Sequence, residues 1–396
     1  MSAGPAIAAP AGLCRHFGEC GGCSLQNLPY PEQLARKKAR VDAALVASGL
    51  KAEAVHPSPD LWFYRNKMEF GFSDVYPPRT EGPSLYLGLK PKGQWRRVLD
   101  LEECRLLSPE APALLAAVRR WAEESRLPPY NSVRHQGFLR HLVVRESKNG
   151  GERMVHLITA PGEFPAESFV AAVKAAYPAS TILRGANAKV SDTASPDSVE
   201  VLCGSGRIME ILRLGGRELR FQISPASFFQ TNTRGAEVLY GIARHWAEEA
   251  APGKILDLYC GGGGFALSLA ELCDKVAGVE SNAAAIEDAK RNAGDNGVLN
   301  AEFYVGATET LLPALLDIKP GAAVADPPRA GLHAKAAAAL RDWGPPLLIY
   351  VSCNPDALGR DLAALAPAYR ADRAEMVDLF PHTEHVETIV RLLRTA

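Results

Sequence analysis

The feature that most constrains the fold is a regular alternation of strands and helices in the C-terminal half, with a run of glycines at its first turn. The first elements are a buried strand, the glycines, a helix, a second strand and a second helix, at residues 254–260, 261–264, 265–272, 275–280 and 283–292. Glu280 ends the second strand, where an acidic side chain can bind ribose hydroxyls. These elements predict an α/β fold with a Rossmann-like parallel sheet that binds a nucleoside-containing cofactor.

The glycine run alone does not identify that cofactor. Gly261, Gly263 and Ala266 satisfy the loose pattern of dinucleotide-binding proteins, so an NAD-linked oxidoreductase is one alternative. S-adenosylmethionine enzymes use the same geometry without a pyrophosphate. A later strand ends in Asp326-Pro-Pro-Arg329, a motif that resembles the substrate-base site of methyltransferases. Enzymes that methylate amino groups usually have an aromatic residue after the prolines, so Arg329 argues against an exocyclic amine as acceptor.

Cys353 stands where a nucleophile is expected. It follows a hydrophobic run at 347–352 that predicts a buried strand, and Asn354 and Pro355 are typical of the start of a helix. A parallel strand would deliver this side chain to the ligand-binding edge of the sheet. Nearby helix N–H groups would favour its thiolate, so we expect a reactive cysteine.

A second group of cysteines indicates a metal site. Cys14, Cys20 and Cys23 lie in a glycine-rich loop, and Cys104 is the best candidate for a fourth thiolate. His16 is a competing ligand, although an exposed loop histidine is the more ordinary interpretation. Zinc and an iron–sulfur cluster both fit four thiolates. Clustered cysteines in an apparently intracellular chain favour metal binding or catalysis over free structural thiols.

The middle of the chain predicts an α+β domain built on antiparallel hairpins. Residues 1–222 carry 29 Lys+Arg and 23 Asp+Glu, a net charge of +6, whereas the remainder carries 15 and 22, a net charge of −7. Basic and aromatic residues are interleaved on the expected strands: Arg65, Lys67, Arg96, Arg97, Arg134, Arg140 and Arg145, with Tyr64, Phe70, Phe72, Trp95 and Phe138. They predict a surface for single-stranded nucleic acid. A sheet with one apolar and one charged face is the alternative, and it suits most of these residues taken singly.

Together, these motifs resemble the RNA uracil-C5 methyltransferases, which make 5-methyluridine in ribosomal and transfer RNA, and the resemblance covers nearly the whole chain. The motifs are Cys14/Cys20/Cys23 with Cys104, Ser227-Phe-Phe-Gln230-Thr-Asn232, Leu256-Asp-Leu-Tyr-Cys-Gly-Gly, Asp326-Pro-Pro-Arg, Ser352-Cys353-Asn-Pro and Phe380-Pro-His-Thr-Glu-His-Val-Glu387. The four cysteines resemble those of the 23S ribosomal-RNA members, which carry a 4Fe-4S cluster. We expect the chain to lack the N-terminal β-barrel RNA-binding domain of some of those members.

The resemblance implies a covalent mechanism with S-adenosylmethionine as cofactor. Cys353 would add to uracil C6, C5 would take the methyl group, and Glu387 would remove the C5 proton. Phe228 could stack on the base. The cofactor and base pocket would be lined by Gln230, Tyr259, Glu280 and Asp326. The target base must leave any stack, so we expect a single-stranded or loop RNA substrate, in 23S ribosomal RNA.

We predict three parts of the chain. Residues 1–110 would hold the cysteine cluster and the start of the recognition domain, 111–222 a central α+β RNA-recognition domain, and 223–396 the S-adenosylmethionine-dependent methyltransferase domain. Residues 1–12 are small and uncharged, without the pattern of a signal peptide, and the chain has no apolar run of membrane-spanning length. We therefore expect a monomeric, cytoplasmic protein with a loose N-terminus and no membrane partner.

Two other functions remain as alternatives. One is an amino-group methyltransferase that acts on another nucleobase or on protein, against which Arg329 and Cys353 both count. The other is a metal-binding RNA-binding protein without catalysis. His382, His385 and Glu387 form a possible metal trio, but no fourth ligand is evident in the sequence, and Glu387 at the start of a strand is better interpreted as a general base.

Overall fold

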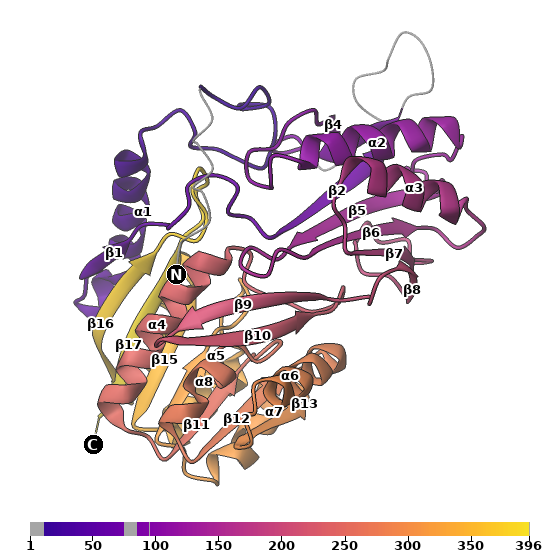
Figure 1. Cartoon of the computed structure of the whole chain (residues 1–396). Coiled ribbons are helices and arrows are strands. Elements are labelled where there is room, and N and C mark those ends of the chain that lie inside the picture. Colours follow the sequence, from indigo (N-terminus) through magenta and orange to yellow (C-terminus); the bar gives the residue numbers. More distant parts are fainter. Residues whose placement is uncertain (1–11, 75–84, 95, 396) are drawn as a thin grey trace. The chain divides into compact units, whose positions relative to one another are not determined.

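The computed structural model describes residues 12–74, 85–94 and 96–395 (Figure 1). Trp95 and residues 1–11, which the sequence analysis assigned to a nucleic-acid surface and a loose N-terminus, lie outside the described residues. Within the described ranges, no helix combines the length and the apolar character needed to cross a lipid bilayer.

The chain divides into two compact units that interleave in sequence. Unit 1 comprises residues 1–28 and 60–208, and unit 2 comprises residues 29–59 and 209–396. This division differs from the three predicted parts, because residues 29–59 leave unit 1 and fold with the C-terminal half. Each unit is described by itself below.

Unit 1 contains, among the residues described, a seven-stranded sheet with helices α2 (Ala111–Glu124) and α3 (Ala166–Ala176) on one face (Figure 1). The strand order is β4-β3-β2-β5-β6-β7-β8. The strands are β2 (Lys67–Ser73), β3 (Tyr86–Leu89), β4 (Leu99–Asp100), β5 (Leu139–Glu146), β6 (Arg153–Thr159), β7 (Thr181–Ala186) and β8 (Ser198–Cys203). Neighbouring strands are antiparallel except for β6 and β7. The predicted α+β architecture is therefore confirmed.

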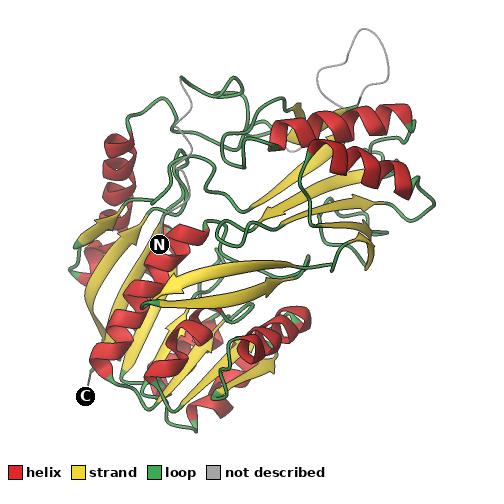
Figure 2. Ribbon diagram, in the orientation of Figure 1, coloured by secondary structure: helices red, strands yellow, loops and turns green. Residues whose placement is uncertain are grey.

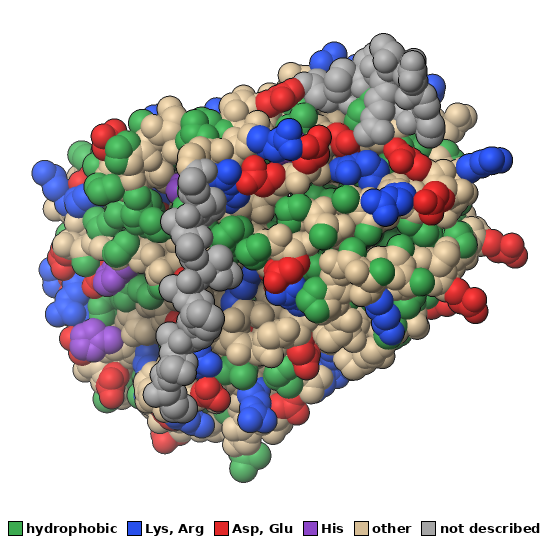
Figure 3. All heavy atoms as spheres, turned by 45° about the horizontal axis from the view of Figure 1, so that its top comes forward, with side chains coloured by type: hydrophobic (Ala, Val, Ile, Leu, Met, Phe, Trp, Pro, Cys, Tyr) green, Lys and Arg blue, Asp and Glu red, His purple; other side chains and the backbone are tan. Residues whose placement is uncertain are grey.

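The predicted stacking surface of unit 1 is wrong for its central aromatic residues. Tyr64, Phe70 and Phe72 are buried in the hydrophobic core, because the alternation along β2 turns the phenylalanines inward. Arg140 is also buried: its guanidinium lies 4.0 Å from the centroid of the Tyr130 ring and donates to backbone carbonyls. On the face shown in Figure 3, basic and acidic side chains are interspersed.

Unit 2 contains, within its described residues, an eight-stranded sheet in the order β1-β16-β17-β15-β14-β11-β12-β13. The strands are β1 (Ala54–His56), β11 (Lys254–Leu258), β12 (Lys275–Glu280), β13 (Ala301–Val305), β14 (Ala322–Ala325), β15 (Leu347–Ser352), β16 (Tyr369–Val377) and β17 (Glu387–Arg394). Strands β11 to β15 are parallel, and β17 is antiparallel to both of its neighbours. This is the Rossmann-like sheet that the sequence predicted, with ligand-binding loops at the carboxyl ends of β11, β12, β14 and β15.

Helices cover both faces of this sheet (Figure 2). One layer comprises α4 (Thr233–Ala250), α5 (Gly264–Leu269) and α6 (Ala283–Asp295), and the other comprises α1 (Tyr30–Leu45), α7 (Thr308–Leu316), α8 (Ala334–Trp343) and α9 (Pro355–Leu365). A separate hairpin, β9 (Ile208–Leu214) and β10 (Arg217–Ile223), packs on α6. Continuous apolar runs in β14 and β15 are buried on both faces, as expected for central parallel strands.

The segment 29–59 completes unit 2 in two ways. Helix α1 packs against α9, where a Cβ atom at Gly359 would lie 3.0 Å from the carbonyl oxygen of Ala44, so the close approach of the two helices needs glycine. Strand β1 pairs in parallel with β16 at the edge of the sheet. The sequence analysis assigned this segment to the first part of the chain because it lies between the cysteines.

Candidate active site

Cys353 lies between β15 and α9, as predicted. The Asn354 side chain caps α9 by accepting a hydrogen bond from the Asp356 N–H at 3.2 Å, and Pro355 is the first helical residue. The Asn354 side chain also donates to the carbonyl oxygen of Arg329 at 3.0 Å. The cap therefore holds the loop after β14 beside the cysteine.

The charge state of Cys353 is the reverse of the sequence-based expectation. The thiol is half-buried, and this burial, together with the nearby carboxyl groups of Glu387 and Asp326, raises its pKa to about 11. A hydrogen bond from Arg329 and its positive charge act in the opposite direction. Burial and carboxylates thus outweigh the helix N-terminus that the sequence suggested would favour the thiolate.

Two carboxyl groups lie beside Cys353: that of Asp326, which is partly exposed, and that of Glu387, which is buried. Asp326 follows β14 and accepts a hydrogen bond from Gln230 Nε2 at 3.1 Å, while Glu387 begins β17. Desolvation raises the pKa of both groups, and the charge of Asp326 raises that of Glu387 further. Glu387 Oε2 has no hydrogen-bond partner within the described part of the chain, so it is available to a ligand or substrate.

Arg329 supplies the positive charge of this site. Its Nη2 lies 2.6 Å from His385 Nδ1, and its charge opposes the rise in the pKa of Glu387. An open pocket of about 280 Å³ lies beside Cys353 and includes Arg40, Arg329 and His385 in its lining. Sequence reasoning treated Arg329 only as a departure from another motif and missed its contact with the nucleophile.

The proposed metal trio is not assembled. His382 Nδ1 lies 3.2 Å from Gln33 Nε2, whereas His385 faces Arg329. In the described residues, no group of three or more His, Cys, Asp or Glu side chains is arranged so that it could hold a metal ion.

The glycine loop after β11 packs closely against its neighbours. Gly261 and Gly263 have φ angles of 52° and 89°, a region that favours glycine. Cβ atoms at Gly262 and Gly264 would lie 3.3 Å from Ser227 Oγ and 2.5 Å from the Tyr240 hydroxyl oxygen. Ser227 and Tyr240 therefore pack so closely against the turn that larger residues at these two positions would not fit without a shift.

Two acidic side chains flank this loop. Asp257, within β11, is fully buried; its Oδ2 accepts from the Ala266 N–H at 2.7 Å, and its Oδ1 has no partner in the described chain. Burial raises the pKa of Asp257 to about 8. Glu280 ends β12 and accepts from the Asn282 N–H at 2.8 Å. Glycines, a strand-end carboxylate and an unpaired buried oxygen suit a cationic nucleoside cofactor.

The remaining predicted residues lie in separate places. Gln230 donates a hydrogen bond to Asp326, which is close to Cys353 and Glu387. Tyr259 has a φ of 67° and packs at the edge of the hydrophobic core, where the Thr308 hydroxyl and the His333 backbone contact it. Phe228 is 62% exposed and lies against the glycine loop.

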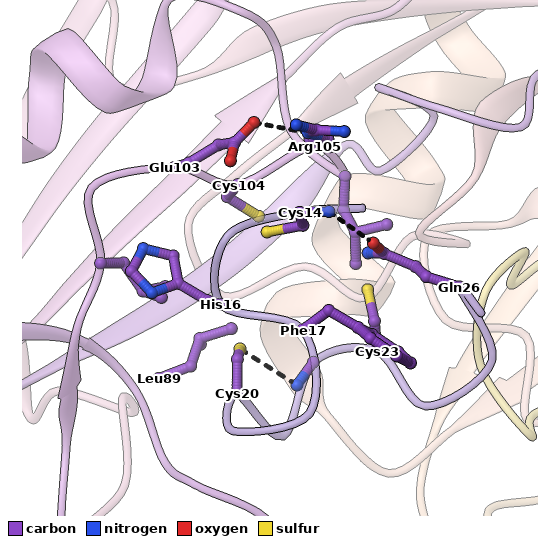
Figure 4. Close-up of a pocket in the computed structure, with 13 residues that line it drawn as sticks. Cys14, His16, Phe17, Cys20, Cys23, Gln26, Leu89, Glu103, Cys104 and Arg105 are labelled. Carbon is purple, nitrogen blue, oxygen red and sulfur yellow. Dashed lines mark hydrogen bonds and ion pairs between the residues drawn. The ribbon is translucent and has the colours of Figure 1, made fainter. Parts of the chain in front are cut away.

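The four predicted metal ligands of unit 1 line one cavity (Figure 4). Cys14, Cys20 and Cys23 come from the N-terminal loop, and Cys104 follows β4. Burial, with a smaller contribution from the other thiols of the group, raises the pKa of Cys20 to about 11 and that of Cys23 to about 12.

Hydrogen bonds fix the backbone around this cavity. Gln26 Oε1 accepts from the Cys14 N–H at 3.0 Å, and Cys20 Sγ accepts from the Gly22 N–H at 3.3 Å. His16 Nε2 accepts from the Glu102 N–H at 3.0 Å, so this nitrogen is already engaged. Cys104 is thus better placed than His16 to act as a fourth ligand.

The chain was compared with known proteins. Residues 183–395, more than half of its length, match the family model described as tRNA (Uracil-5-)-methyltransferase. Proteins named as uncharacterized RNA methyltransferases from Nitratidesulfovibrio vulgaris and Clostridium tetani are 38% and 36% identical to it, each over 96% of this chain and 82% and 83% of their own lengths.

A solved structure agrees. The Pyrococcus abyssi tRNA (uracil-54, C5)-methyltransferase in complex with S-adenosyl-L-homocysteine is 31% identical, with a TM-score of 0.76 over 94% of this chain and 86% of that one. Because it covers 94% of this chain, the similarity extends over both units. The chain belongs to the tRNA (uracil-5-)-methyltransferase family.

Proposed function

We propose that this protein transfers a methyl group from S-adenosylmethionine to C5 of a uridine in RNA, with Cys353 as nucleophile and Glu387 as base. The observation that carries the proposal is the convergence of Cys353, Asp326 and Glu387 at the ligand-binding edge of the sheet. An amino-group methyltransferase needs no cysteine there, and a non-catalytic RNA-binding protein needs no buried, unpaired glutamate.

Cys353 starts the reaction because uracil C5 is a weak nucleophile. The thiolate adds to C6, a C6–S bond forms, and the electron pair of the C5–C6 double bond makes C5 an enolate carbon. Arg329, hydrogen-bonded to the cysteine, favours its thiolate form. The raised pKa of the free thiol makes this support necessary.

S-adenosylmethionine, when bound, supplies an electrophilic methyl group to C5. The residues that would hold it are the glycine loop, with Glu280 toward the ribose and the unpaired Oδ1 of Asp257 near its positive charge. These groups are anionic or neutral, as a cationic cofactor requires.

Glu387 completes the cycle. Its carboxylate takes the C5 proton, the electron pair of the C5–H bond restores the C5–C6 double bond, and the C6–S bond breaks to return the Cys353 thiolate. Burial makes an ionised Glu387 a stronger base than a carboxylate in water, since its pKa is raised. Its unpartnered Oε2 is the atom available for this proton.

Substrate recognition would use the polar groups around Asp326. Its carboxylate can accept from uracil N3–H, and the Gln230 amide that donates to it can pair with a carbonyl of the base. The exposed Phe228 offers a surface for stacking. A base reaches this depth only when it is flipped out of its stack, so the substrate is a single-stranded or loop uridine.

We propose 23S ribosomal RNA as the substrate and a 4Fe-4S cluster as the group bound by Cys14, Cys20, Cys23 and Cys104. Four thiols around one cavity provide the thiolate set that such a cluster uses, and a zinc ion is the alternative. Transfer RNA is the alternative substrate, because the similar Pyrococcus abyssi protein is named for transfer RNA.

The decisive experiment uses RNA that contains 5-fluorouridine together with S-adenosylmethionine. Fluorine at C5 prevents proton removal, so the protein–RNA adduct should persist on a denaturing gel. Cys353→Ala should abolish the adduct, whereas Cys273→Ala, a matched change at another partly buried cysteine of unit 2, should not. Full adduct formation by Cys353→Ala would contradict the mechanism. Competing 23S and transfer-RNA transcripts would identify the substrate.

The cluster is tested separately. Protein purified without oxygen should contain iron and acid-labile sulfide and absorb visible light, and Cys20→Ser should lose both. Cys203→Ser, at a cysteine of unit 1 outside the cavity, is the control. If the purified protein is colourless and contains one zinc ion per chain, the cluster proposal is wrong and the four cysteines bind zinc.

A further inference from the structure

Lys37, on α1, is a charged side chain with no exposed surface. Its Nζ donates to Asp378 Oδ1 at 2.7 Å and to the Phe380 carbonyl oxygen at 2.9 Å, and the Asp378 side chain is also 0% exposed. Lysine is almost never fully buried unless it is paired. A buried ion pair therefore joins α1 to the segment that follows β16.

Further hydrogen bonds surround the pair. Asp378 Oδ2 accepts from the Tyr30 hydroxyl at 2.9 Å, and Oδ1 also accepts from the Phe380 N–H at 3.1 Å. The Tyr30 oxygen in turn accepts from the Ser58 N–H at 2.8 Å. Burial lowers the pKa of Lys37, and the Asp378 carboxylate opposes that change. Each partner thus keeps the other from being an isolated buried charge.

A second contact lies one helical turn earlier. Gln33 precedes Lys37 by four residues, so both side chains project from the same face of α1. Gln33 Oε1 accepts from the His382 N–H at 2.8 Å, and its Nε2 lies 3.2 Å from His382 Nδ1. His382 has a φ of 67°, a conformation that a non-glycine residue keeps only when its surroundings hold it.

The segment held in this way, residues 378–386, leads directly to Glu387. Glu387 is the first residue of β17 and pairs with Val377, the last residue of β16. Within the segment, the Phe380 carbonyl that accepts from Lys37 also accepts from Thr383 Oγ1 at 2.8 Å, and Thr383 Oγ1 accepts from the His385 N–H at 3.1 Å. Hydrogen bonds therefore connect α1 to the backbone of His385, two residues before Glu387.

A buried ion pair is a poor source of stability compared with apolar residues of the same volume, because both charges lose their hydration. It does fix an orientation, because few geometries satisfy every donor and acceptor of the pair. Proton removal requires such fixation, since a displacement of about 1 Å at a reacting group can lower a rate by about a hundredfold.

We propose that Lys37 and Asp378 are positioning residues for Glu387, and that they act on the step in which Glu387 removes the C5 proton. This inference rests on the proposed function. In that step the C5–H electrons restore the C5–C6 double bond, the C6–S bond breaks, and the proton passes to Glu387. Addition of Cys353 and methyl transfer precede this step and do not need Glu387.

The test is the double variant Lys37→Met/Asp378→Asn in the full-length holoprotein, which removes both charges and leaves neither buried alone. The matched control is Lys38→Met, the same substitution at the next residue, where the lysine is 34% exposed and pairs with Asp42 on the helix surface. Gln33→Leu is a second variant that removes the His382 contacts without any change in charge. Melting temperature and S-adenosylhomocysteine binding are measured for all variants.

We expect the double variant to form the 5-fluorouridine adduct within about twofold of the wild-type rate and to bind S-adenosylhomocysteine normally. With ordinary uridine RNA, its turnover should fall by about a hundredfold, and covalent protein–RNA complex should accumulate because the adduct is not released. Gln33→Leu should show the same accumulation to a smaller extent. A general loss of structure would instead lower adduct formation and cofactor binding together.

The inference is overturned if the double variant turns over ordinary RNA like Lys38→Met, or if its adduct formation falls in parallel with turnover. If the double variant does not fold, Gln33→Leu decides: normal release of ordinary RNA overturns the inference, and trapped adduct supports it. Failure of the wild type to form any 5-fluorouridine adduct would refute the proposed function itself, and is distinct from both results.

Discussion

Alkylation of Cys353 in the free protein should depend steeply on pH. Iodoacetamide reacts with the thiolate, and with a pKa of about 11 only about one Cys353 thiol in a thousand is ionised at pH 8. An ordinary cysteine with a pKa of about 8.5 is roughly one-quarter ionised at that pH. Because a thiolate of higher pKa is also about tenfold more nucleophilic, the rate for Cys353 should be lower than that of an ordinary thiol by roughly 20-fold, and it should rise tenfold for each pH unit.

The assay is alkylation from pH 7 to pH 9.5 without RNA or cofactor, with the Cys353 peptide quantified by mass spectrometry and glutathione as internal reference. Partial burial slows the reaction at every pH but does not change its slope, so the slope decides the question. Arg329→Gln should lower the rate further, because Arg329 stabilises the thiolate. A rate that levels off near pH 8 would show that the helix N-terminus dominates and would refute the argument from burial.

Three further results are expected. Glu387→Gln should keep Cys353 addition but lower turnover by about 10²- to 10⁴-fold, so that covalent complex with ordinary uridine RNA accumulates on a denaturing gel; prompt release of methylated RNA would exclude Glu387 as the base. Gly264→Ala would place a Cβ atom 2.5 Å from the Tyr240 hydroxyl oxygen and should lower the free energy of unfolding by about 1–3 kcal/mol in urea, with partial recovery when Tyr240→Phe is added. Leu256→Ala, at a fully buried position of β11, should cost about 2–5 kcal/mol in the same assay, and a cost below 1 kcal/mol would mean that the core closes around the cavity.

Sequence patterns predicted those elements of unit 2 whose structure depends on residues close together in the sequence. The strand that ends at Ser352, the Asn354 cap and the glycine turn all depend on residues within a few positions of each other. The predicted strand at 275–280 coincides with β12 for the same reason. The assembly of Gln230, Asp326 and Glu387 rested on the family resemblance and not on any local pattern.

What the sequence did not predict comes from contacts between distant segments. The buried face of α1 carries Gln33 and Lys37, residue types that normally face solvent. The hydrophobic pattern of this segment therefore does not predict a helix that packs on the core. The pKa of Cys353 was predicted in the wrong direction because the cap is local whereas its burial and the carboxylates are not. The aromatic residues of β2 looked like stacking surfaces because alternation does not reveal which face is covered.

The exchange of segment 29–59 between the units has a consequence for synthesis on the ribosome. Helix α1 leaves the exit tunnel early, but its partner Asp378 and the strand that pairs with β1 are made last. Until then Lys37 and the apolar face of α1 have no native contacts, so unit 2 closes only after the chain is almost complete. Separate expression of residues 209–396 would leave Asp378 as an unpaired buried carboxylate and β16 as an open sheet edge, which predicts an aggregation-prone fragment. Because the sequence of unit 1 lies between the two segments of unit 2, unit 2 cannot be produced as one continuous fragment of the chain.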